Sequence, residues 1–109
     1  MKLIIAIVQD EDASRLISTL MNEGYSVTKL ATTGGFLRAG NTTLLLGGED
    51  DRVKGALDVI ERVCKSRKQI ATSPSPVAGT SGGYAPYPIE VVVGGATVFV
   101  LDVEQFVKF

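Results

Sequence analysis

Two hydrophobic periodicities alternate along the first part of the chain. Residues 2–8 form a short, nearly continuous apolar run, typical of a central strand that is buried on both faces. Between residues 10 and 23 the apolar positions recur at helical spacing, behind three acids that suit the start of a helix. Gly24 fits the left-handed residue that ends a helix, and residues 25–32 return to an extended pattern. This part therefore predicts a strand, a helix and a second strand.

The same kinds of element follow. Residues 42–48 are strand-like and are joined to the preceding strand by a glycine-rich loop, residues 33–41, which indicates a long hairpin. Acids at 49–51 precede apolar residues at helical spacing up to Cys64, and the basic residues Lys65, Arg67 and Lys68 suit the negative end of that helix.

A long stretch without charge, residues 72–88, follows the second helix. It contains all four prolines and three glycines, which predicts an unusually long loop. Residues 89–93 and 96–103 predict strands, and the Gly94-Gly95 pair between them indicates a two-residue hairpin. The tail, residues 105–109, is too apolar to hang free.

The order of elements predicts an α+β fold of the ferredoxin-like βαββαβ type, a sandwich with an extra C-terminal strand hairpin, in one domain over residues 1–109. Both helices would cover one face of the sheet. Because the first strand is apolar throughout, the other face needs a partner, and a homo-oligomer packed with its sheet faces inward meets that need.

Composition and charge exclude several classes of function. A net charge of −1 and a pI near 5.3 argue against broad basic surfaces for nucleic acid or for anionic membranes. The opening apolar run is too short for a signal peptide or a membrane span, so we expect no membrane insertion and a cytoplasmic location. A single cysteine, Cys64, lies at an apolar helical position and predicts a small buried side chain rather than a nucleophile.

Catalysis is the weaker hypothesis. The chain has no histidine, which removes the commonest general base and metal ligand. Most carboxylates lie at the two predicted helix starts, where the helix dipole explains them without a paired-acid or metal role. Lysine chemistry stays open, but no surrounding residues indicate it.

Residues 25–48 carry two cations, five glycines and no acid. Residues 35–42 nearly match a phosphate-binding P-loop, but Asn41 replaces its lysine and a strand follows, so a Walker site is excluded. Glycine N–H groups can approach an anion, an asparagine amide can read a purine edge, and Phe36 offers a stacking face. Two interpretations remain open from these residues alone, a ligand loop and glycines that merely shape a hairpin. Phe99, by the same reasoning, suits core or subunit packing as well as base stacking.

Residues 29–43 resemble the hallmark stretch of the PII-like cyclic di-AMP receptors. Their sequence is Lys-Leu-Ala-Thr-Thr-Gly-Gly-Phe-Leu-Arg-Ala-Gly-Asn-Thr-Thr. Residues 1–10, 51–53, 86–88 and 93–100 resemble the same family, so the similarity spans the chain. It implies a homotrimer with three cyclic di-AMP sites in the clefts between neighbours, and loops that change order when the ligand binds. The tyrosine that is modified in nitrogen-regulatory PII proteins has no counterpart in the first loop.

The resemblance also implies which residues contact the ligand. Asn41 would read an adenine edge, Phe36, Leu37 and Phe99 would flank the bases, and Thr28 would meet ribose or phosphate together with backbone amides near Gly35 and Gly47. The remaining expected contacts are Ser26, Val27 and Lys108. Ser26 stands where relatives can carry an arginine and Lys108 where they can carry a glutamine, so a bidentate phosphate donor is replaced by a point charge.

The implied function is a non-enzymatic receptor that binds cyclic di-AMP, needs no cofactor or metal, and alters contacts with an unidentified protein partner through loop ordering. Two alternatives stay open. One is a related sensor of ATP or another adenine nucleotide, and the other is a small phosphodiesterase.

Overall fold

The structure is a computed structural model that describes residues 1–30, 40–76 and 84–109, with the side chains of residues 71–76 and 84–87 outside that description. The described residues form a mixed α+β fold that is consistent with the predicted ferredoxin-like βαββαβ core. In chain order the elements are β1 (Lys2–Gln9), α1 (Asp10–Asn22), β2 (Thr28–Leu30), β3 (Asn41–Gly48), α2 (Asp50–Cys64), β4 (Arg67–Pro76), β5 (Tyr84–Val93) and β6 (Ala96–Asp102).

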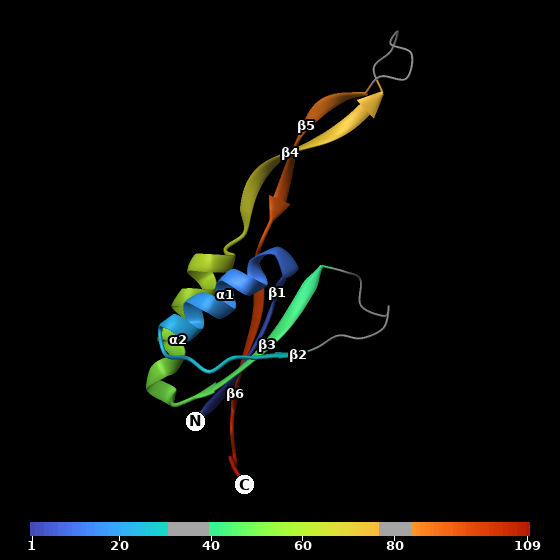
Figure 1. Cartoon of the computed structure of the whole chain (residues 1–109). Coiled ribbons are helices and arrows are strands. Elements are labelled where there is room, and N and C mark those ends of the chain that lie inside the picture. The colour runs from blue at the N-terminus through green and yellow to red at the C-terminus, as the bar shows by residue number, and fades with distance from the viewer. Residues whose placement is uncertain (31–39, 77–83) are drawn as a thin grey trace.

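Four strands form one antiparallel sheet in the order β2-β3-β1-β6, and both helices pack on the same face of it (Figure 1). Successive side chains of a strand point to opposite faces, so every second residue of β1 lies under the helices. Ile4, Ala6 and Val8 are at most 4% exposed there. The helices contribute the other half of this core, including Leu16, Leu20, Val59, Ile60 and Cys64.

The intervening residues of β1 face away from the helices. Leu3, Ile5 and Ile7 are half-buried, and Ile5 is in register with Leu45 of β3 and Phe99 of β6. A first correction concerns β1, which within a single chain is buried on one face only, because no described element covers its second side. The sequence assigns that side to a partner. We call this side of the four-stranded sheet the open face.

The predicted loop at residues 72–88 is a second correction. β4 and β5 pair as an antiparallel ribbon from Arg67↔Val93 to Pro76↔Tyr84, so most of this stretch is strand, while residues 77–83 lie outside the described part. Prolines are tolerated here because both strands of a two-stranded ribbon are edge strands. We call this ribbon, residues 67–76 and 84–93, the arm.

The C-terminal hairpin is a third correction, because Gly94-Gly95 does not connect two paired strands. β5 pairs with β4 and β6 pairs with β1, so the two glycines redirect the chain from the arm back into the main sheet, at φ angles of 82° and 95°. The arm stands away from the helices and the sheet (Figure 1). It gives the chain a radius of gyration of 18.9 Å, against roughly 13 Å for a compact domain of this size.

Candidate functional site

Several of the expected ligand contacts lie on the open face. Thr28, Leu45, Ile5 and Phe99 form one continuous row across β2, β3, β1 and β6. Gly47 is in register with Leu3, in the neighbouring row of the same face. Phe99 is 53% exposed, which leaves a large apolar ring partly in solvent on this face.

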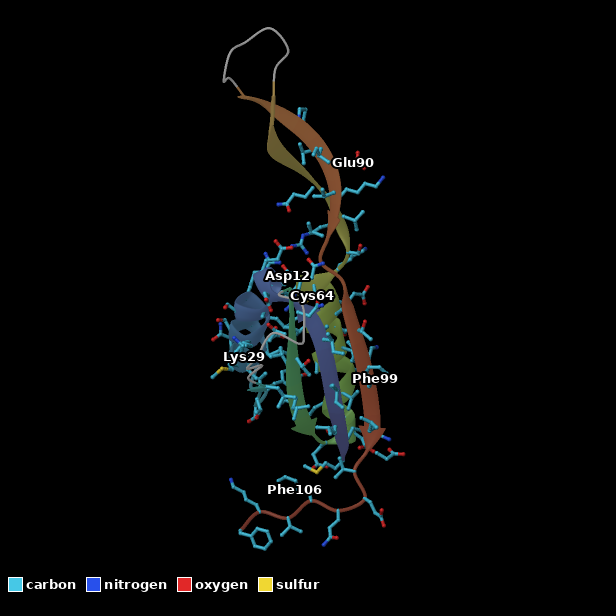
Figure 2. The ribbon with its side chains drawn as sticks, turned by 90° about the vertical axis from the view of Figure 1, so that its right-hand side faces the viewer. Asp12, Lys29, Cys64, Glu90, Phe99 and Phe106 are labelled. Atoms are coloured by element: carbon cyan, nitrogen blue, oxygen red, sulfur yellow. The ribbon has the colours of Figure 1, made fainter. Side chains whose placement is uncertain are left out.

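The single chain does not bring these residues together. Asn41 and Gly47 lie at opposite ends of β3, and six positions of extended strand separate them by ~20 Å. Thr28 and Phe99 lie on the two edge strands of the sheet, three strand spacings or ~14 Å apart. Figure 2 shows this spread: Lys29, the neighbour of Thr28, and Phe99 lie at opposite edges of the sheet.

Three more of the expected contacts have described positions outside the sheet. Ser26 is exposed in the connection that precedes β2, whereas the side chain of Val27 packs against the core and leaves its main chain as the contact we expect. Lys108 is exposed on the tail, beyond Phe106, which itself is 65% exposed and lies away from the sheet and the helices (Figure 2). The tail thus extends freely from a single chain. The expected contacts at Gly35, Phe36 and Leu37 lie outside the described residues.

Asp10 holds the start of β3 from both sides of Asn41. Its N–H donates to the carbonyl of Gly40 at 2.8 Å, and its carboxylate accepts the N–H of Gly40 at 3.2 Å and the hydroxyl of Thr42. From the sequence, Asp10 is expected only at the start of a helix. The structure confirms that it lies in the first turn of α1. Its contacts with residues 30 and 32 positions further along, however, depend on the β1–β3 register, which no local pattern reveals.

Beside this contact lies a hollow of about 340 Å³. Its lining consists of Gln9, Asp10, Glu11, Gly40 and Asn41. Two carboxylates belong to the described part of that lining, and their oxygens can accept hydrogen bonds from the N–H donors of a base. The exposed amide of Asn41 lies beside them.

A clamp fixes the connection that leads into β2. The guanidinium of Arg52 stacks 4.3 Å from the ring centre of Tyr25 and donates to the carbonyl of Glu23 at 3.0 Å. The hydroxyl of Tyr25 donates in turn to the carbonyl of Arg52 at 3.1 Å. This clamp sets the path of the chain just before Ser26 and Thr28.

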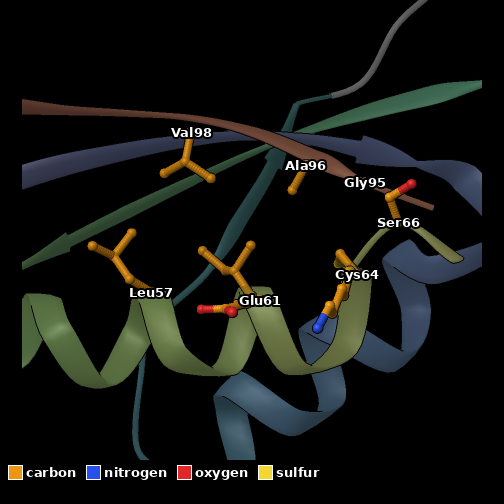
Figure 3. Close-up of a pocket in the computed structure, with 9 residues that line it drawn as sticks. Leu57, Glu61, Cys64, Ser66, Gly95, Ala96 and Val98 are labelled. Atoms are coloured by element: carbon orange, nitrogen blue, oxygen red, sulfur yellow. The ribbon is translucent and has the colours of Figure 1, made fainter.

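A second hollow, of about 320 Å³, lies between α2 and β6 (Figure 3). Leu57, Cys64 and Val98 line it among other residues. Cys64 is fully buried, as predicted, and burial raises the pKa of its thiol to about 11, to which the nearby Asp12 carboxylate adds. A thiol of this kind is a packing group rather than a nucleophile at neutral pH.

Across residues 1–30, 40–76 and 84–109, cysteine and carboxylate side chains nowhere gather in a group of three or more suited to a metal ion. Within the same ranges, neither helix is long and apolar enough to cross a membrane.

Comparison with known proteins gives the family. A solved structure described as a functionally unknown protein from Pediococcus pentosaceus matches with a TM-score of 0.77 and 44% sequence identity, over 99% of this chain and 96% of that one. The family model for the cyclic-di-AMP receptor matches residues 1–109. A match over the whole chain, together with the hallmark string around Asn41, means that this chain belongs to the cyclic-di-AMP receptor family.

Proposed function

We propose that the chain is a non-enzymatic, cytoplasmic receptor, one domain over its whole length, that binds cyclic di-AMP in the clefts between the subunits of a homotrimer. The observation that carries this proposal is the dispersal of the expected contacts over one open face. Asn41 and Gly47 are ~20 Å apart in one chain, so one ligand meets both groups most simply where two copies adjoin.

The open face supports the assembly independently. Its row of Leu45, Ile5 and Phe99 is apolar, and no element among the described residues covers it. Burial of apolar area contributes roughly 25 cal/mol per Å². The tail adds Phe106 and Phe109 as further exposed apolar groups. A closed oligomer with its sheet faces inward would bury both sets.

Charge supports the orientation of the ligand. The hollow at Asn41 is lined by two carboxylates, which suits the adenine end. The phosphates would lie nearer Ser26, Thr28 and Gly47, where a hydroxyl, main-chain amides and Lys108 of an adjoining copy are the available partners. Lys108 then contributes a point charge rather than a bidentate donor.

The first turn of α1 supports a signalling role, because it touches both the end of the ligand loop and the base of the arm. Asp10 bonds Gly40, and Asp12 binds Arg67 at the start of β4. The side-chain oxygen of Gln9 accepts a hydrogen bond from the N–H of Gly94 at 2.7 Å, where the chain leaves the base of the arm after β5. A ligand that favours one arrangement of residues 33–41 would thereby shift the arm between states and alter binding of a protein partner, whose identity is open.

Isothermal titration tests the proposal, with tens of micromolar protein and cyclic di-AMP, cyclic di-GMP and ATP as ligands. We expect saturable heat with cyclic di-AMP, one site per chain, a trimeric mass by light scattering and no hydrolysis product by chromatography. A preference for cyclic di-GMP, or no heat with the adenine ligand, would contradict the proposal, and displacement by ATP at equal concentration would favour the adenine-nucleotide alternative.

Asn41→Ala provides the residue-level test. A buried adenine edge would lose its partner, so we expect binding to weaken by about 1 to 3 kcal/mol while the melting temperature holds. If the Asn41→Ala variant keeps wild-type affinity for cyclic di-AMP, Asn41 is a turn residue and not a ligand contact.

A further inference from the structure

Asn41 is the first residue of β3, where it is in register with Gln9 of β1. A side chain that reads a base edge must be placed to within tenths of an ångström. Contacts that fix the residues on either side of Asn41 therefore bear directly on its role.

Asp10 supplies that placement through the two residues that flank Asn41. Gly40 exchanges two hydrogen bonds with Asp10, one with its main chain and one with its carboxylate. The Thr42 hydroxyl, in a side chain only 6% exposed, donates to the other carboxylate oxygen. Thr42 faces the helices, so the alternation of the strand turns Asn41 to the opposite side.

Helix stabilisation does not account for these contacts. The N-cap of α1 is Gln9, and no side-chain hydrogen bond caps this helix. The Asp10 carboxylate oxygens instead accept hydrogen bonds from Gly40 and Thr42, at the start of β3. Asp51 is also exposed and lies in the equivalent first turn of α2, so it offers a matched control for the helix-dipole effect of removing such an acid.

We propose that Asp10 is a positioning residue, which holds Gly40 and Thr42 so that the Asn41 amide is set to read the adenine edge. The inference rests on the proposed function, and the contacts themselves do not depend on it. Asp10 acts through Asn41 and does not itself need to touch the ligand.

A double-mutant cycle tests this inference by titration with cyclic di-AMP. We expect Asp10→Ala to raise Kd about tenfold, the effect of losing roughly 1.4 kcal/mol, and Asp51→Ala to leave Kd unchanged at a similar loss of helix stability. In the Asn41→Ala background, Asp10→Ala should change Kd by less than about twofold, because the residue through which it acts is gone. Equal effects of Asp10→Ala in both backgrounds would overturn the inference.

Thr42 provides a second route should Asp10→Ala lower the melting temperature strongly. Thr42→Val keeps the shape of the side chain and removes the hydroxyl, so it should raise Kd. Thr42→Ser keeps the hydroxyl and should leave Kd at the wild-type value. Equal affinity for Thr42→Val and wild type would also count against the inference. A wild-type chain that bound no cyclic di-AMP would contradict the proposed function itself, whereas wild-type binding that Asp10→Ala and Thr42→Val leave intact would overturn the positioning role alone.

Discussion

Asp12 and Arg67, which are 55 positions apart in the chain, form a bidentate ion pair between the first turn of α1 and the first residue of β4. The two nitrogen–oxygen distances are 2.9 and 3.3 Å. The Asp12 side chain is 3% exposed and that of Arg67 is 40% exposed. The sequence predicts Arg67 as a partner for the negative end of the second helix, and its guanidinium does donate to the carbonyl of Lys65, the C-cap residue of α2, at 3.2 Å. The sequence does not reveal that Arg67 also begins the arm and binds Asp12.

The ion pair predicts unequal effects of mutating its two partners. Asp12→Ala should lower the free energy of unfolding by about 1 to 3 kcal/mol, because it removes charge-assisted hydrogen bonds. Arg67→Met should be at least as damaging, because it leaves a buried carboxylate without its main partner. Arg67→Lys should restore little, since an ammonium lacks the planar pair of parallel donors that a guanidinium presents to the two oxygens. Urea denaturation measures each effect.

The arm contains its own control for this prediction. Lys68 and Glu90 form an ion pair at 3.3 Å with both side chains largely exposed. Pairs of this kind contribute almost nothing to stability, so Lys68→Met should be close to neutral. A Lys68→Met effect as large as that of Arg67→Met would show that any charge at the arm base matters equally, against the prediction.

The clamp at Tyr25 predicts that Gly55→Ala lowers stability in the wild-type chain and raises it when the Tyr25 hydroxyl is removed. A Cβ added to Gly55 would lie inside the van der Waals distance of the Tyr25 hydroxyl oxygen, while the ring carbon that bears it is 3.6 Å away. Gly55→Ala should therefore destabilise the wild-type chain despite the better helix propensity of alanine. In the Tyr25→Phe background the obstacle is gone, and the same change should stabilise by up to about 1 kcal/mol. Thermal denaturation of the four variants checks this, and the same sign in both backgrounds would refute it.

Burial of Cys64 predicts a dependence on alkaline pH. The pKa of its thiol is raised from an ordinary value of 9.0 to about 11 in the folded chain. A group with a raised folded-state pKa adds stability that is complete below its unfolded pKa and is lost as the pH rises through the folded value. The contribution should therefore be intact at about pH 8 and fall between about pH 9 and 11. The difference in melting temperature between wild type and Cys64→Ala should narrow over that window.

Thiol labelling checks the same feature directly. At about pH 8 only about one Cys64 thiol in a thousand is ionised, and the side chain is shielded, so a soluble disulfide reagent should leave the native protein unmodified and react at once in denaturant. Native labelling at the rate of the unfolded chain would contradict the pKa assignment.

The sequence predicted well those elements whose residues carry their own signal. The helical period ending at Gly24 gave the first helix to within a residue, and the spacing up to Cys64 gave the end of the second. The unbroken apolar run predicted the central strand correctly. Its expected burial on both faces depends on a partner, which the sequence of one chain does not show. Local periodicity records that a residue is apolar and does not record what covers it.

The errors arose where pairing between distant strands decides the structure. The four prolines between residues 72 and 88 indicate a loop because proline weakens a sheet, yet a two-stranded ribbon has only edge positions and accepts them. Gly94-Gly95 has the composition of a hairpin, and only the alternative partner β1 reveals that it redirects the chain. Asp10 was missed as a site residue for the same reason, because its contacts exist only in the β1–β3 register.

The open face makes a prediction about assembly that does not involve the ligand. Leu101 is in register with Leu3 on that face and is 45% exposed, so a charge there would remain in water in a single chain but would be buried in a trimer packed through this face. Leu101→Glu should therefore give monomers by light scattering with an unchanged far-ultraviolet circular dichroism spectrum. Met21 on α1, 61% exposed on the helical side, is the matched control, and Met21→Glu should leave the oligomer intact. An oligomer that survived Leu101→Glu and dissociated with Met21→Glu would mean that the helices, and not the open face, form the interface.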